Sequence, residues 1–150
     1  MRIEVRGIPK PQGSKSPKGR NAQGHAIVVE SCKALPQWRY DVTMMAIEQR
    51  QKHGKITGPV LMRATFTMPK PTGAPKKKRT YADKKPDLSK LVRAVEDALT
   101  AAGVWEDDAR VVLMAACKTF PGEVMFSGCE PLDSPGCVIE ILPITEARQL

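Results

Sequence analysis

Hydrophobic and polar residues alternate in some stretches of the chain and form short apolar runs in others. Alternation over residues 2–8 and 60–68 is typical of strands that bury one face, and the apolar runs are typical of further strands. The Pro121-Gly122 turn is expected to lead into residues 123–127 as the returning strand of a hairpin. The predicted strands are residues 2–8, 26–30, 60–68, 110–120, 123–127 and 137–142.

Two stretches have helical periodicity instead. Residues 33–52 place apolar side chains on one face, including Trp38, and Gly54 stops this helix. Residues 87–102 form the clearest helix: at about 100° per residue its apolar side chains fall within an arc of roughly 120°. Gly103 ends it, as glycine after a helix often does. Strands that are partly adjacent in sequence, combined with two helices, predict an α+β fold with a mixed sheet in one domain spanning residues 1–150.

Two basic loops, at about residues 9–25 and 69–86, separate these elements. Both are rich in proline, glycine and lysine, and residues 9–24 are not expected to form regular structure. Loops of this length are usually functional or linkers. The second loop is either disordered alone or an arm that orders on a partner.

The net charge of +8 is unevenly distributed along the chain. Residues 1–39 carry eight basic and two acidic side chains, residues 70–93 carry nine and two, and residues 94–150 carry three and ten. Segregation of this kind indicates a surface for a polyanion with an acidic centre inside it. Charge alone leaves open that the basic run at residues 76–79 is a solvated loop without a partner.

Other classes of protein are disfavoured by what the sequence lacks. No apolar run approaches the ~20 residues of a membrane span, and residues 1–10 do not resemble a signal peptide. We therefore expect a cytoplasmic protein with no membrane association. The four cysteines form no CxxC pair and there are only two histidines, which favours reduced thiols over a zinc site. No small-molecule cofactor is expected.

Charged residues on and after the 87–102 helix are the candidates for metal binding and catalysis. Lys90, Arg93 and Asp97 share the flank opposite the apolar stripe, and Asp87 stands at the helix start. Glu106-Asp107-Asp108 precedes an apolar strand, where a short return could bring carboxylates near Asp87. Paired carboxylates hold Mg²⁺ for phosphodiester hydrolysis, and a guanidinium can neutralise the transition state.

The same residues also have an ordinary structural interpretation. Asp87 can be only a helix cap, Arg93 and Asp97 only an i,i+4 ion pair, and Asp107-Asp108 only turn residues. Physical reasoning from these residues does not separate the two interpretations.

A longer pattern resembles a known family. Residues 85–112, KPDLSKLVRAVEDALTAAGVWEDDARVV, resemble the signature of RusA-type Holliday-junction resolvases, which are common in bacteriophages and prophages. The pattern comprises K-P-D, a leucine, a basic residue, D-A-L, a glycine, and D-D before a strand. Residues 7–15, GIPKPQGSK, and residues 30–39, ESCKALPQWR, are also similar to the family. The resemblance covers most of the chain in order.

This resemblance implies a homodimeric, Mg²⁺-dependent endonuclease, in which Mn²⁺ can substitute, that cuts branched DNA such as four-way junctions by paired nicks. Asp87 and Asp108 match the metal-binding aspartates, and Arg93 matches a basic residue that assists at the phosphate. Asp107, which we expect as a further metal ligand, and Asp97 match acidic positions of the motif. Ser89 departs from the family, because many members have an aspartate there, and its hydroxyl could orient a metal-bound water.

The basic loops are expected to contact DNA phosphates without reading bases. The candidate side chains are Lys15, Lys76, Lys77, Lys78, Arg79, Lys84, Lys85 and Lys90. Tyr81 either stacks on an unpaired base or packs on its own loop. Two rival functions stay open: a non-catalytic protein that binds branched or single-stranded DNA, and a nuclease of the same fold that cuts flaps.

Overall fold

The structure is a computed structural model that describes residues 1–13, 15–30 and 32–144, with residues 15–17 and 28–30 described for their backbone only. Four strands form one mixed sheet in the order β1-β6-β4-β5. They are β1 (Arg2–Arg6), β6 (Gly136–Pro143), β4 (Val60–Thr67) and β5 (Val111–Thr119). The first three pair antiparallel, and β5 runs parallel to β4. The predicted α+β class with a mixed sheet is confirmed.

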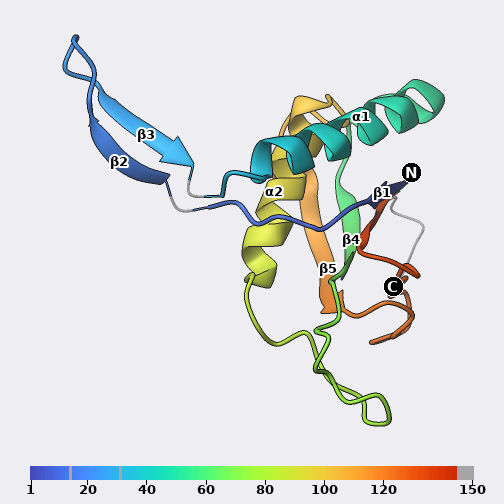
Figure 1. Cartoon of the computed structure of the whole chain (residues 1–150). Coiled ribbons are helices and arrows are strands. Elements are labelled where there is room, and N and C mark those ends of the chain that lie inside the picture. Colours follow the sequence, from blue (N-terminus) through green and yellow to red (C-terminus); the bar gives the residue numbers. More distant parts are fainter. Residues whose placement is uncertain (14, 31, 145–150) are drawn as a thin grey trace.

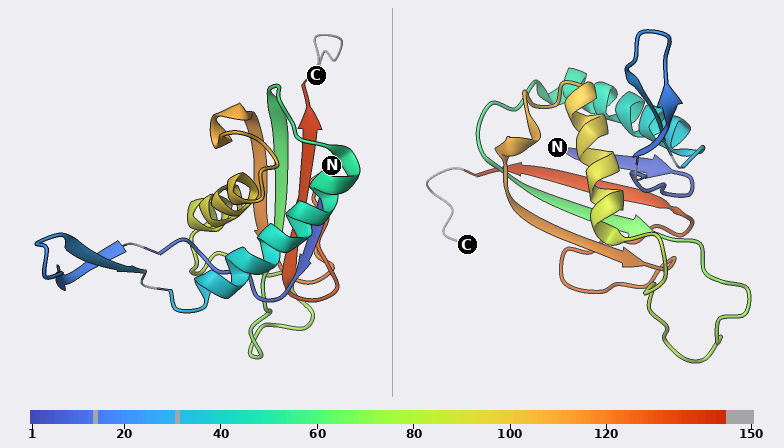
Figure 2. Two further views of the ribbon diagram at one scale, coloured as in Figure 1. Left: turned by 90° about the horizontal axis from the view of Figure 1, so that it is seen from above. Right: turned by 90° about the vertical axis from the view of Figure 1, so that its left-hand side faces the viewer.

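Both helices cover the same face of this sheet (Figure 2). They are α1 (Leu35–His53) and α2 (Leu88–Ala101), close to the predicted ranges. The apolar stripe of α2 is buried, and Trp38 is in the core, as its spacing predicted. Trp105 is in the core as well. Gly103 follows α2 with φ +67°, a conformation that favours glycine. Apolar packing between helices and sheet therefore fixes where each residue of α2 lies relative to β5.

The opposite face of the sheet corrects two predictions. Residues 123–127 form no strand; this segment turns and continues across the sheet, where the N–H groups of Glu130 and Leu132 donate to the hydroxyls of Thr65 and Thr67. Because helices lie on one face and this segment on the other, β4 buries both faces rather than the one that its alternating sequence predicted.

A third correction concerns the first basic loop. Residues 15–20 form β2 (Lys15–Arg20), which pairs antiparallel with β3 (Ala26–Glu30) in a hairpin that projects from the body (Figure 1). Asn21 Oδ1 accepts hydrogen bonds from two backbone N–H groups and stabilises the turn. Cross-strand pairing with an apolar partner outweighs the poor strand propensity of a Pro- and Gly-containing segment, and the register shifts between Pro17 and Arg20. The strand predicted at residues 26–30 is confirmed.

The second basic loop contains no helix or strand between β4 and α2, as predicted, and is called the arm (residues 69–86) below. The 3-10 helix η1 (Asp108–Arg110) joins α2 to β5. The strand order makes β4, arm, α2 and β5 one β-α-β unit. Within the described residues, no helix combines the length and hydropathy needed to cross a membrane.

Candidate active site

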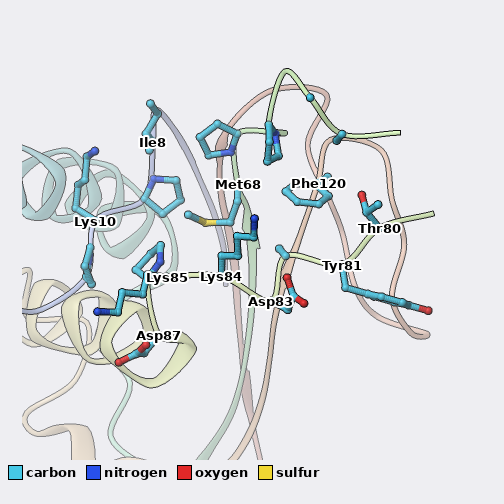
Figure 3. A pocket seen from close by; sticks show the side chains of 18 of the residues that line it. Ile8, Lys10, Met68, Thr80, Tyr81, Asp83, Lys84, Lys85, Asp87 and Phe120 are labelled. Carbon is cyan, nitrogen blue, oxygen red and sulfur yellow. The ribbon is translucent and has the colours of Figure 1, made fainter. Parts of the chain in front are cut away.

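A cavity of about 1210 Å³ lies at the carboxyl ends of the two parallel strands (Figure 3). Met68, just after β4, and Phe120, just after β5, form part of its apolar floor. The arm forms a wall, and Lys10 enters from the segment that follows β1. Carboxyl ends of parallel strands are where α/β units commonly bind ligands, because loops and helix N-termini meet there.

Asp87 stands at one side of this cavity and is not engaged in capping. It occupies the N-cap position of α2, but its side chain makes no capping hydrogen bond. Its carboxylate is 52% exposed and pairs with Lys90 Nζ at 3.3 Å. The purely structural interpretation, an aspartate that caps its own helix, is therefore wrong for Asp87. Its carboxylate can accept a ligand.

Lys118 holds the backbone immediately before Asp87. Its Nζ donates to the carbonyl oxygens of Lys84 at 2.8 Å and Pro86 at 2.7 Å. These bonds tie the end of the arm to the carboxyl end of β5. The sequence interpretation missed Lys118, although a single cation late in an otherwise apolar strand was a signal.

Gln12 ties a second segment to the same place. Its backbone N–H donates to the carbonyl of Lys90 at 2.8 Å, so the chain after β1 lies against the first turn of α2. The side chain of Gln12 is buried, and its Oε1 has no hydrogen-bond partner among the residues that the structure describes. Gln12 falls within the RusA-like residues 7–15, but its role was not predicted.

The cations predicted to bind DNA are distributed unequally around the cavity. Lys78, Arg79, Lys84, Lys85 and Lys90 line it. In Figure 3, Lys84 extends toward the side of Met68 and Phe120, and Lys85 toward the side of Lys10 and Asp87. Lys76 and Lys77 are exposed elsewhere on the arm, and the side chain of Lys15 lies outside what the structure describes.

Arg79 has a second task, because it anchors the arm. Its Nη2 donates to the carbonyl oxygen of Val124 at 2.7 Å, and the guanidinium lies 5.4 Å from the ring centroid of Tyr81. Tyr81 is nonetheless exposed, so one aromatic surface remains open to solvent. Its position is compatible with either of the two expected roles.

A second acidic group surrounds Asp108, further along α2. Burial, followed by the charges of Asp108 and Asp97, raises the pKa of Glu96, whereas Arg93 lowers it. Glu96 is thus a carboxylate of this group that sequence reasoning missed. Asp107 caps η1, because its Oδ1 accepts the N–H of Ala109 at 2.8 Å. The capping role therefore applies to Asp107, while Asp108 is exposed.

Asp97 and Ser89 occupy different surroundings on α2. Asp97 pairs with Arg39 of α1, with Nη2 and Oδ2 3.6 Å apart, and so forms an interhelical ion pair rather than the considered pair with Arg93. Ser89 is exposed and borders a groove between α2 and β5 that also includes Glu96. Ser89, Arg93 and Glu96 share one flank of α2, at the spacing of successive helical turns.

The carboxylates suit Mg²⁺ in their chemistry, since this ion takes one or two protein carboxylates and completes its shell with water and phosphate oxygens. Asp87 stands at the start of α2, and the charge of Asp108 acts on Glu96 further along the same helix. Nine residues of α2, about 13 Å along its axis, separate Asp87 from Glu96, the neighbour of Asp108. Among the described residues, no three acidic, His or Cys side chains form a group that could hold a metal.

Comparison with known proteins identifies the chain as a nuclease. A sequence profile described as "Endodeoxyribonuclease RusA" matches residues 9–125, which include the segment after β1, the arm, α2 and β5. No curated protein sequence matched the chain significantly. A match over most of the 150 residues establishes the family. The chain belongs to the RusA family of endodeoxyribonucleases, hydrolases of phosphodiester bonds that act on crossover junctions.

Proposed function

We propose that this endodeoxyribonuclease resolves four-way DNA junctions by paired symmetric nicks, as a Mg²⁺-dependent homodimer in which Mn²⁺ can replace Mg²⁺. It would act in DNA recombination and repair in the cytoplasm of a bacterial host, encoded by a phage or prophage. The observation that carries this proposal is the carboxylate of Asp87, which does not cap α2 and stands at a cavity lined by cations. A carboxylate that does not cap its helix and is surrounded by cationic side chains is suited to hydrolysis of DNA.

The arm supplies the contacts to DNA. Lys84, Lys85 and Lys90 border Asp87 in the cavity, so a phosphate that they bind is held close to that carboxylate. Lysine contacts of this kind position a DNA strand without reading its sequence. Junctions are distinguished from duplex by shape and deformability, and sequence-tolerant contacts serve that purpose.

Asp87 and Asp108 would hold the cation, with Asp107 contributing the carboxylate oxygen that η1 does not use. When bound, Mg²⁺ supplies charge stabilisation at the phosphate and lowers the pKa of a water. Arg93 lies on the flank of α2 between the two acidic groups and would neutralise charge on the attacked phosphate. Ser89 would orient a water through its hydroxyl, in place of the carboxylate that other family members have.

A dimer suits the task because resolution needs two cuts in symmetry-related strands. A twofold protein presents two sites related in the same way as those strands. One copy would therefore cut each strand.

The proposal is tested with a synthetic four-way junction, a flap and a linear duplex, each incubated with Mg²⁺, Mn²⁺ or EDTA. The variants are Asp87→Asn and Asp108→Asn. Their matched controls are Asp41→Asn on α1 and Glu106→Gln, which remove one carboxylate outside the proposed machinery. We expect paired symmetric nicks in the junction that require the metal and both aspartates, and that survive in both controls.

Three results would contradict the proposal in different ways. Binding of the junction without any cutting would favour a non-catalytic branched-DNA or single-stranded-DNA binder. A flap cut much faster than the junction would favour a flap nuclease of the same fold. Full activity of Asp87→Asn would show that the cavity is not the catalytic site.

A further inference from the structure

Three consecutive apolar side chains are exposed in the segment that follows β5. Val124, Met125 and Phe126, called the apolar triplet below, are 56%, 38% and 40% exposed. Single apolar residues on a surface are ordinary, but connecting turns are built mainly from polar residues, glycine and proline. Exposed apolar side chains that adjoin one another mark a surface where a partner binds.

Hydrogen bonds hold the apolar triplet at both ends. The N–H of Cys129 donates to the carbonyl oxygen of Phe126 at 3.0 Å. From the arm, Arg79 Nη2 donates to the carbonyl oxygen of Val124 at 2.7 Å and lies 3.4 Å from the sulfur of Met125. The triplet is therefore held in one arrangement, so that binding a partner costs little conformational entropy.

The apolar triplet continues the surface of the cavity at the candidate active site. Arg79 lines that cavity, and its guanidinium lies 5.4 Å from the ring centroid of Tyr81, which is 59% exposed. Figure 3 places Tyr81 and Asp87 at opposite ends of the cavity, with Lys84 between them in this view. A DNA strand with a phosphate at Asp87 and Lys84 would therefore meet an exposed aromatic and apolar surface at the other end.

Charge favours DNA over a second copy of the chain as the partner of this surface. Arg79 contacts both Val124 and Met125, and the arm to which it belongs is cationic. Glu123, the acidic residue beside the triplet, is paired with Lys70 at 2.7 Å. A polyanion is therefore attracted here, whereas two such surfaces that face each other would bring two cationic arms together.

A four-way junction differs from linear duplex in the base faces that it exposes. Inside a duplex every base pair is stacked on both sides, so its faces are not accessible. At a branch point the strands change partners, and the base pairs beside it lose a stacking neighbour when the arms of the junction open. These faces are flat and apolar, and apolar or aromatic side chains can stack on them.

We infer that the apolar triplet, together with Tyr81, stacks on a base pair exposed at the branch point and so distinguishes junctions from linear duplex. The cations of the arm attract DNA of any shape, because all DNA carries phosphates, whereas stacking requires a base pair without a neighbour. Stacking also tolerates any base, so this contact recognises structure rather than sequence. The inference rests on the proposed function and names the feature of the substrate that the enzyme recognises.

The test is equilibrium binding of the full chain to a labelled four-way junction and to a linear duplex of the same arm sequence, in EDTA so that nothing is cut. The variants are Phe126→Ala and Met125→Ala. Their matched controls are Tyr40→Ala and Met44→Ala on α1, where these side chains are 59% and 46% exposed. We expect Phe126→Ala to raise the Kd for the junction about tenfold, and Met125→Ala to raise it as well. The Kd for the duplex should not change, and the controls should change neither.

Two further measurements separate stacking from other causes. The slope of log Kd against log salt should be the same for Phe126→Ala as for the unsubstituted protein, because no phosphate contact is lost. With p-benzoylphenylalanine in place of Phe126, irradiation should cross-link the protein to nucleotides beside the branch point. Circular dichroism should show equal thermal midpoints for variants and controls, which excludes misfolding.

The inference is overturned if both variants bind the junction as tightly as the controls, or if they weaken binding of junction and duplex equally. Cross-links found only in the arms of the junction, away from the branch point, would also overturn it. So would a lower mass of Phe126→Ala in sedimentation equilibrium without DNA, because the triplet would then contact a second copy.

Junction cleavage in Mg²⁺ is measured separately on the same samples. Selective binding of the junction without any cutting contradicts only the proposed resolvase activity. Cutting of the junction by variants that keep full selectivity contradicts only the contact at the branch point.

Discussion

The Nζ atom of Lys118 lies 2.7 Å from the carbonyl oxygen of Pro86, the residue that precedes Asp87. One amine from a strand thus fixes the backbone at the start of α2, and a second bond to Lys84 fixes the end of the arm. The position of the candidate catalytic carboxylate depends on a side chain that does not itself face the cavity.

Replacing Lys118 by methionine should impair cleavage more than binding. A hydrogen bond from a charged donor contributes roughly 1.5–3 kcal/mol, so we expect the cleavage rate of bound junction to fall about tenfold or more. Single-turnover rates measured at saturating protein separate this effect from affinity. Lys118→Arg retains a donor and should recover part of the rate, and Lys52→Met controls for the loss of a surface cation. Equal losses in Lys118→Met and Lys52→Met would refute the positioning role.

Mutation of Asp107 should lower the stability of the protein, whereas mutation of Asp87 should leave it almost unchanged. The reason is that the side chain of Asp107 caps η1, while that of Asp87 does not cap α2. Asp107→Ala should lower the free energy of unfolding by roughly 1 kcal/mol, since the N–H of Ala109 loses its acceptor. Asp107→Asn keeps an acceptor and should restore most of that stability. Asp87→Asn should change stability by less than about 0.5 kcal/mol, because its side chain makes no capping bond, yet abolish cleavage. Urea denaturation and junction cleavage of the same preparations check both outcomes.

Glu96→Gln should stabilise the protein increasingly as pH rises. Burial, with the neighbouring charge of Asp108, raises the pKa of Glu96 in the folded chain. Above the ordinary glutamate pKa of about 4.3, the unfolded chain therefore releases this proton first, and the stability of the unsubstituted protein declines through that range. Glutamine does not titrate, so the stability of the variant lacks this decline with pH. Urea denaturation should show that Glu96→Gln increases the free energy of unfolding more at pH 7 than at pH 4. An equal increase at both pH values would contradict this prediction. Glu48→Gln, which breaks the exposed pair with Lys52, is the control.

The arm should carry a measurable part of the salt dependence of DNA binding. Replacing Lys76, Lys77 and Lys78 by alanine should flatten the slope of log affinity against log salt, by up to ~0.9 for each phosphate that the variant no longer neutralises. Arg79→Ala is measured apart, because Arg79 anchors the arm on Val124 and its removal changes arm geometry as well as charge. An unchanged slope in the triple variant would show that these three lysines do not contact DNA.

Hydrophobic periodicity and apolar runs predicted both helices and all four strands of the main sheet. Most of these elements bury the apolar side chains that form the pattern, although Val112, Leu113 and Met114 of β5 are exposed. The β2–β3 hairpin was missed, since its pairing depends on a partner strand rather than on the propensity of residues 15–20. The strand expected at residues 123–127 was wrong, because this segment forms turns and its continuation at Glu130 and Leu132 hydrogen-bonds to β4 instead. The roles of Lys118 and Glu96 depend on the packing of β5 beside α2, which the sequence does not give, although the single cation in β5 was a signal for Lys118.

The arm is a single loop within the β-α-β unit, and both of its ends are fixed. Met68 donates its N–H to Thr119 at one end, and Lys118 holds the other. Insertions or deletions between these two points leave the register of β4 and β5 unchanged, because neither strand gains or loses a residue. Evolution can therefore alter the reach and charge of this wall of the cavity by changing one loop, while the scaffold that carries Asp87 is inherited intact.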